Sequence, residues 1–166
     1  MTNETSGLSV IEAKAYIFSI DFSQIMDKME KTYKWKRKDL MEVCELYRHY
    51  LFLKKKYEHE DYAMPPSEDI DEFRHNHILD TKKYAVDCQK IFGRYLHHYP
   101  YLGMDEKTND DDLQGFFETT QKLHHEEFGD YIYHVRHKLR KQIVMFFKLL
   151  FKKNRGQLAS KNANPI

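Results

Sequence analysis

The chain has 166 residues, which is enough for one domain with a substantial core. Its 27 Lys and Arg nearly balance its 26 Asp and Glu, so net charge gives no reason to expect a nucleic acid or an acidic substrate as partner. The chain has 6 Gly, 4 Pro, 12 Tyr and 11 Phe, a composition that favours long helices around an aromatic core over a turn-rich β fold.

The expected helices fill a single domain over residues 9–154, between a polar start at 1–8 and a basic tail at 155–166, both predicted to be disordered. An apolar-rich segment runs over residues 9–29, where Ser19, Asp21 or Ser23 could start a second helix. A clearer amphipathic helix is predicted over 36–57, because apolar side chains recur there at helical spacing: Leu40, Val43, Cys44, Tyr47 and Leu51.

Pro65-Pro66-Ser67 separates this part of the chain from a predicted pair of helices. Ser67 should cap a helix over 68–79, and Asp80-Thr81 should cap one over 82–97. An acidic loop at 99–112 then precedes helices ending at Gly129 and spanning 130–153. No strand alternation of useful length and no internal repeat occurs in the sequence. The predicted fold class is therefore all-α, a compact single-domain bundle of about five to seven helices.

The two cysteines and the apolar runs indicate where the protein works. Cys44 and Cys88 lie far apart without C-x-x-C spacing, which favours buried free thiols in a reducing compartment. The start of the chain lacks the basic and apolar regions of a secretory signal. The most apolar run, at 143–151, is far shorter than the ~20 residues that a membrane span needs. We therefore expect a soluble cytoplasmic protein.

The sequence DEFRHNHILD, at residues 71–80, places two histidines one residue apart in a predicted helix. Positions two apart on a helix differ in direction by about 200°, so His75 and His77 should face different surroundings and should not share one ion. His77 lies four residues after Phe73 on the apolar face, either as a core imidazole or as a ligand of a buried site. His75 lies four residues after Asp71, which either fixes its tautomer or makes an ordinary surface contact.

The functional hypothesis for this region is a metal site. Cys88 is expected to face inward on the next helix, and a helical hairpin could bring it near His77. A structural zinc site needs four protein ligands and a catalytic one three, for which Asp87 or His97 is available. His98 is a poor further ligand if the helix continues, because it would then lie ~15 Å from Cys88. With Zn²⁺ as the candidate ion, the candidate ligands are His75, His77, Asp87 and Cys88.

Other motifs assign no reaction. The sequence contains no glycine-rich nucleotide loop, no G-x-S-x-G and no H-E-x-x-H. His124-His125, beside two glutamates, is expected to be solvated. Residues 131–155 hold eight Lys or Arg and no acid, typical of a helix that binds an anionic membrane or a partner's groove, or that packs on its own bundle. Its candidate contact residues are Leu139, Ile143, Phe146, Lys141 and Lys148.

From residue 65 to 93 the sequence PPSEDIDEFRHNHILDTKKYAVDCQKIFG resembles the signature of the glycine-rich domain-containing protein-like family, in which Trp-His-x-His precedes Tyr, Asp-Cys and Gly. ETTQKLHHEEFG and the amino-terminal half extend the resemblance to roughly residues 20–129, as in small bacterial-type members without the glycine-rich region. Arg74 stands where the family usually has Trp, which implies a more polar pocket. The matching residues are His75, His77, Tyr84, Asp87, Cys88 and Gly93. The resemblance implies that these side chains meet in the hairpin, and it implies no reaction.

Two functions follow as hypotheses. The first is a non-enzymatic helical interaction module that binds another protein, with a peripheral anionic membrane as the second choice of partner and nucleic acid not expected. The alternative is a metal-binding protein, enzymatic or not, that uses the His-x-His…Asp-Cys hairpin. Further binding candidates beside that hairpin are Arg74, Tyr84, His97 and His98.

Overall fold

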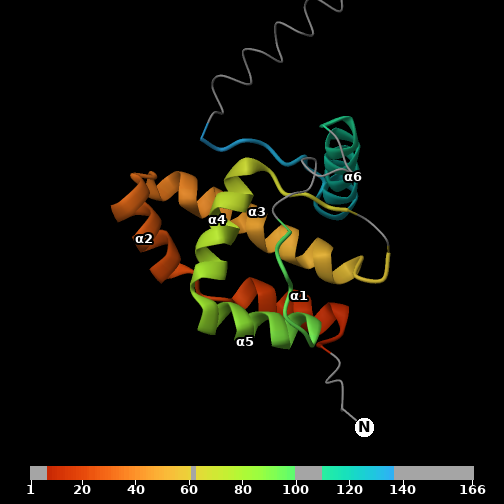
Figure 1. Ribbon diagram of the computed structural model, residues 1–166, viewed down its shortest axis with the longest axis horizontal. Coiled ribbons are helices and arrows are strands. Elements are labelled where there is room, and N and C mark those ends of the chain that lie inside the picture. The colour runs from red at the N-terminus through yellow and green to blue at the C-terminus, as the bar shows by residue number, and fades with distance from the viewer. Residues whose placement is uncertain (1–6, 61–62, 100–109, 137–166) are drawn as a thin grey trace, which may run out of the picture. The chain divides into compact units, whose positions relative to one another are not determined.

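A computed structural model describes residues 7–60, 63–99 and 110–136, and it contains six helices and no strand over these ranges (Figure 1). The helices are α1 (Val10–Ser19), α2 (Ser23–Tyr33), α3 (Arg37–Lys56), α4 (Glu68–Leu79), α5 (Thr81–Phe92) and α6 (Asp110–Phe128). All six lie in the first of two compact units, which ends at Tyr133. The predicted all-α class is confirmed. None of the described helices is both long and apolar enough to span a bilayer.

The starts of α1 and α2 follow from local capping. Ser9 Oγ accepts a hydrogen bond from the Glu12 backbone N–H (3.4 Å), and the Glu12 carboxylate accepts one from the Ser9 N–H (3.0 Å). The N-cap residue of α2, Phe22, makes no side-chain cap bond, but the preceding Asp21 carboxylate accepts a bond from the Ser23 N–H at 2.9 Å. Residues 9–29 therefore divide into two helices, and of the three predicted starting residues Asp21 and Ser23 lie at the start of the second while Ser19 ends the first.

The hairpin of α4 and α5 begins as predicted and ends earlier. Ser67 precedes α4, although its buried hydroxyl makes no hydrogen bond to any described residue. Asp80 caps α5 by accepting a bond from the Lys83 N–H at 3.4 Å. The predicted end of this helix at His97 is wrong, because Gly93 adopts the left-handed conformation (φ 71°) and stops the helix at Phe92.

The predicted helix over 130–153 does not begin at Asp130. The described residues after α6 are not helical. The Gln121 side chain binds the Ile132 backbone there: its amide N–H donates to the Ile132 carbonyl, and its amide oxygen accepts from the Ile132 N–H, both at 2.8 Å. The rest of that predicted helix lies outside the described residues. So do its five candidate contact residues: Leu139, Ile143, Phe146, Lys141 and Lys148.

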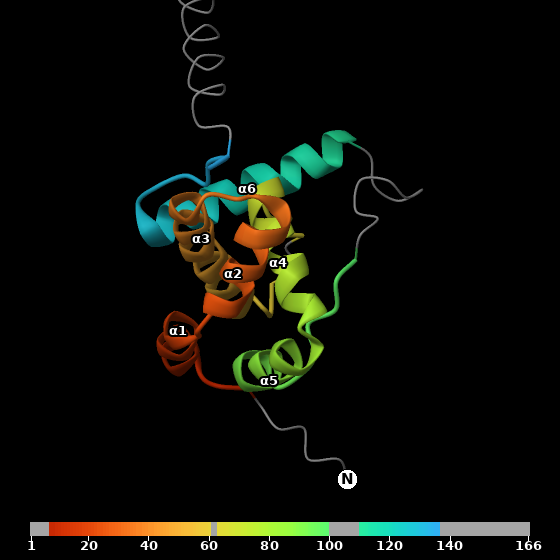
Figure 2. The same cartoon turned by 90° about the vertical axis from the view of Figure 1, so that its left-hand side faces the viewer.

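Helix α3 is the centre of the first unit, packing against α1, α2, α4 and α6, while α5 lies beside α1 and α4 (Figures 1 and 2). The core between these helices is aromatic, as the composition predicts. Phe22, Tyr47, Phe73 and Tyr84 are almost fully buried. Three of these rings lie edge-on to His77, with ring centroids 5.0–5.8 Å from its own: Phe22, Tyr47 and Tyr84. This packing fixes the buried face of α4, and with it the direction of the opposite face.

Candidate functional site

His77 lies on the buried face of α4 with 1% of its surface exposed. Its Nδ1 is 2.9 Å from the Tyr47 hydroxyl, and its Nε2 is 3.0 Å from Asp87 Oδ2. The same carboxylate accepts a bond from the Tyr16 hydroxyl at 2.5 Å and lies 3.3 Å from Lys83 Nζ. Since both ring nitrogens have protein partners, His77 acts as a core imidazole that joins four helices.

The electrostatics of this buried network fit a structural role. Burial alone would raise the pKa of the Asp87 carboxyl, but hydrogen bonds from His77 and Tyr16 and the charge of Lys83 outweigh it and lower that pKa. Burial raises the pKa of the Cys88 thiol, so this side chain stays protonated and is a poor nucleophile. Both cysteines, Cys44 and Cys88, are free and buried, as predicted.

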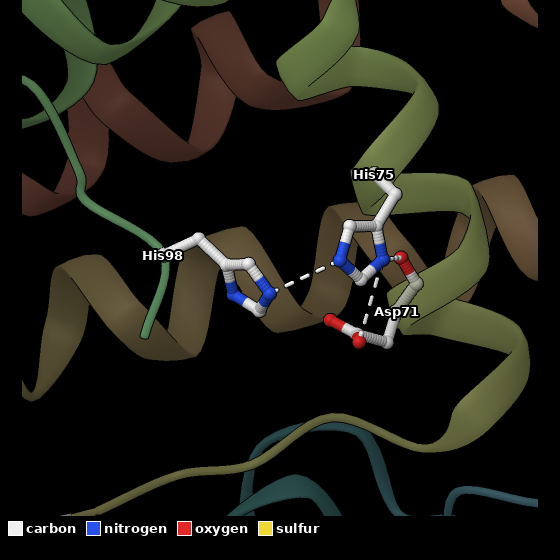
Figure 3. A group of neighbouring side chains, drawn as sticks. All are labelled: Asp71, His75 and His98. Atoms are coloured by element: carbon white, nitrogen blue, oxygen red, sulfur yellow. Dashed lines mark hydrogen bonds and ion pairs between the residues drawn. The ribbon is translucent and has the colours of Figure 1, made fainter. Parts of the chain in front are cut away.

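His75 lies on the other side of α4, as the helical spacing predicts, and there it meets Asp71 and His98 (Figure 3). Its Nδ1 is 2.7 Å from the Asp71 carbonyl oxygen and 3.4 Å from Asp71 Oδ2. Its Nε2 is 3.0 Å from His98 Nε2. Each of the three residues offers one ligand atom, and these atoms lie within 4.8 Å of one another. This spacing is suitable for a single metal ion.

The predicted ligand set is thus divided between two places. His77 and Asp87 meet in the core, Cys88 packs there beside the Tyr84 hydroxyl, and His75 joins the cluster on the opposite face. His98, which helical geometry made a poor further ligand, joins His75 because α5 ends at Gly93 and the chain turns back along α4.

Arg74 fixes the direction of the hydrogen bonds in this cluster. Its Nη1 lies 2.9 Å from His98 Nδ1, and because a guanidinium only donates, that nitrogen must accept. Burial and the Arg74 charge lower the pKa of His98, which keeps the ring neutral with its proton on Nε2. That proton is donated to His75 Nε2, and His75 Nδ1–H is donated to the Asp71 carbonyl.

A cavity of about 440 Å³ opens beside the cluster. Three of the four predicted binding residues line it: Arg74, His97 and His98. The basic side chains of Lys54 and His75 line it as well. Apolar side chains complete much of the wall, among them Tyr50, Met64, Pro65 and Leu96. The fourth predicted residue, Tyr84, stands behind this wall and donates to the Leu96 carbonyl at 2.6 Å.

A second pair of histidines, not predicted from the sequence, links α3 and α6. His49 Nδ1 lies 3.0 Å from His124 Nε2, and His124 Nδ1 donates to the Asp130 carbonyl at 2.6 Å. The predicted solvation of His124 is wrong, since the ring is buried. Burial, His124 and Lys14 lower the pKa of His49 to about 4. This pair is neutral packing between two helices.

The fold and the cluster define a class: an all-α protein with a histidine–histidine–aspartate group beside a partly apolar cavity. A protein-family model described as UCP032817-like matches residues 12–149, and the chain belongs to that family. The match includes both histidine clusters, and the family description names no activity. Neither a curated protein nor a solved structure matches the chain. Membership of the glycine-rich domain-containing protein-like family stays a prediction.

Proposed function

We propose that this protein is a helical binding module that holds a divalent transition-metal ion, with Zn²⁺ the first to test, through Asp71, His75 and His98. The approach of the two Nε2 atoms to 3.0 Å carries the proposal. Two nitrogens bound at 2.0–2.1 Å to a tetrahedral ion lie about 3.3 Å apart, so the rings need to separate only slightly once the proton on His98 Nε2 has left. Two histidines and a carboxylate are also a donor set that zinc and Fe²⁺ enzymes use.

The position of His75 favours binding further. Its Nδ1–H donates to the Asp71 carbonyl, which leaves the Nε2 lone pair toward His98. A hydrogen bond on the nitrogen away from the ion is the usual support of a metal-binding histidine. The Asp71 carboxylate adds a negative charge, and its Oδ1 is buried without a hydrogen bond to any described residue. An ion would give Oδ1 a closer partner than the Arg74 guanidinium, which lies 3.5 Å away.

Three protein ligands leave a tetrahedral ion with one position for water or a ligand. The ion would stand beside the cavity, since all three residues line it. This arrangement differs from a closed structural zinc site, and it supports a binding role in which the ion contacts a second molecule.

The test compares two neighbouring histidines. Protein purified without a histidine tag and stripped by a chelator should bind one Zn²⁺ per chain in calorimetry. His98→Ala should weaken that affinity by more than about tenfold, because the loss of even an outer support costs 10–100-fold. His97→Ala is the matched control, since His97 lines the cavity outside the three-residue cluster. Failure of the stripped protein to take up Zn²⁺, Co²⁺ or Fe²⁺, or an equal loss in both variants, would end the proposal.

The other predicted roles stay predictions. A protein partner would bind through a groove between helices or through the basic segment, and an anionic membrane through that segment, which lies mainly outside the described residues. The cytoplasmic location also stays a prediction.

A further inference from the structure

Arg74 lines the cavity together with the three proposed ligands. Its guanidinium donates to His98 Nδ1, lies 3.5 Å from Asp71 Oδ1, and is centred 5.8 Å from the middle of the Tyr50 ring. Only 7% of the residue is exposed, yet it lines the cavity. Any ligand that enters the cavity can therefore reach the group that controls His98.

In its present place Arg74 opposes the ion. For His98 Nε2 to bind a metal, the neutral ring must carry its proton on Nδ1. Arg74 already directs an N–H at that atom from 2.9 Å, so two donors would face each other. His98 becomes a good ligand once the guanidinium has another acceptor, and the cavity is where such an acceptor would bind.

The lining indicates what the acceptor is. A volume of about 440 Å³ falls in the range of small-molecule sites. Arg74 and Lys54 supply positive charge, and Tyr50, Met64 and Leu96 supply apolar surface. Glu68 and Asp71 also line the cavity, but Asp71 is a proposed ligand of the ion, whose charge would offset these carboxylates. Burial and the nearby charges of Arg74 and Arg94 lower the pKa of Lys54, so an anion between these groups would relieve their repulsion. A planar guanidinium matches a carboxylate with two parallel hydrogen bonds.

We infer that the cavity binds a small carboxylate with an apolar body, and that this carboxylate draws Arg74 from His98 and binds cooperatively with the metal ion. The inference rests on the proposed metal site. The ion adds positive charge beside the cavity, and the carboxylate releases the His98 tautomer that the ion needs. By linkage each ligand must raise the affinity for the other by the same factor.

Calorimetry with Zn²⁺ and benzoate tests this coupling. Saturating benzoate should raise the Zn²⁺ affinity of the stripped protein by roughly tenfold, within the usual 5–150-fold range of coupling between sites, and Zn²⁺ should raise benzoate affinity equally. Benzamide, the neutral isostere, should have no effect. In Arg74→Met the Zn²⁺ affinity without benzoate should exceed that of the wild type, and benzoate should no longer change it. Lys82→Met, at an exposed residue of α5, is the control and should keep the wild-type coupling.

The outcomes separate the two proposals. Zn²⁺ binding that benzoate does not change overturns the inference and leaves the metal site standing, whereas no Zn²⁺ binding overturns both. An equal effect of inorganic phosphate overturns the requirement for an apolar body. If Arg74→Met does not fold, Lys54→Met decides: weaker benzoate binding to the zinc-loaded protein with unchanged Zn²⁺ affinity supports the inference, and wild-type benzoate affinity overturns it.

Discussion

Replacing Asp87 with alanine should destabilise the fold by about 3 kcal/mol, because it removes the centre of the buried network. Asp87 is 3% exposed, and its carboxylate contacts the Tyr16 hydroxyl at 2.5 Å, His77 Nε2 at 3.0 Å and Lys83 Nζ at 3.3 Å. Leaving a buried polar group without its partner costs ~1–3 kcal/mol, and both Tyr16 and His77 lose theirs. Lys83 can turn to water and adds little, which places the expected total at about 3 kcal/mol.

Urea unfolding followed by circular dichroism measures this loss, with Asp27→Ala as the control. Asp27 pairs with Arg37 at 2.5 Å, but the two side chains are 52% and 41% exposed, so the loss should stay below ~1 kcal/mol. Asp87→Asn should fall between the two variants because it keeps one acceptor oxygen. If Asp87→Ala and Asp27→Ala lose the same stability, the network does not hold the helices together and the reasoning about α4 is wrong.

Three further predictions concern pH and backbone geometry. His49 has a folded pKa of about 4 against ~6.5 when unfolded, so stability should be full above pH ~6.5 and fall by up to about 3 kcal/mol as pH drops toward 4. His49→Gln should flatten that part of a pH series of thermal melts, and an unchanged slope would contradict the assignment. Gly93→Ala should cost about 1–2 kcal/mol in urea unfolding, because its φ of 71° strains any residue with a Cβ. Gly7→Ala would place a Cβ 2.5 Å from the Gly93 nitrogen, so the Leu8 amide, which donates to the Lys90 carbonyl, should exchange faster with deuterium; unchanged exchange would refute this.

Much of the fold could be predicted because the spacing of apolar residues and the proline, glycine and capping residues at helix ends are both local features of single helices. The periodic stripe over 36–57 gave α3 to within a residue at each end, and Pro65-Pro66-Ser67 located the start of α4. The end of α5 was missed although its signal was present. Gly93 is the residue type that ends helices in the left-handed conformation, and the apolar stripe that continued beyond it was given more weight.

The site could be predicted only as far as local geometry reaches. Asp71 and His75 are four residues apart on one helix, so their contact follows from helical spacing. His98 reaches His75 through a non-helical return of the chain, which no periodic pattern encodes. His49 and His124 are likewise brought together by the packing of α3 on α6. Contacts of this kind depend on tertiary structure and carry no signal in a short window of sequence.

The single residue between His75 and His77 gives one helix two separate tasks. His77 is held by Tyr47 and Asp87 in the core, which fixes the rotation of α4 about its axis. That rotation in turn directs His75 toward the cavity, where its Nε2 stands 3.0 Å from that of His98. A binding site keeps its geometry when a packed second layer supports its side chains. His77 therefore provides the rigidity that His75 would need to hold the proposed metal ion.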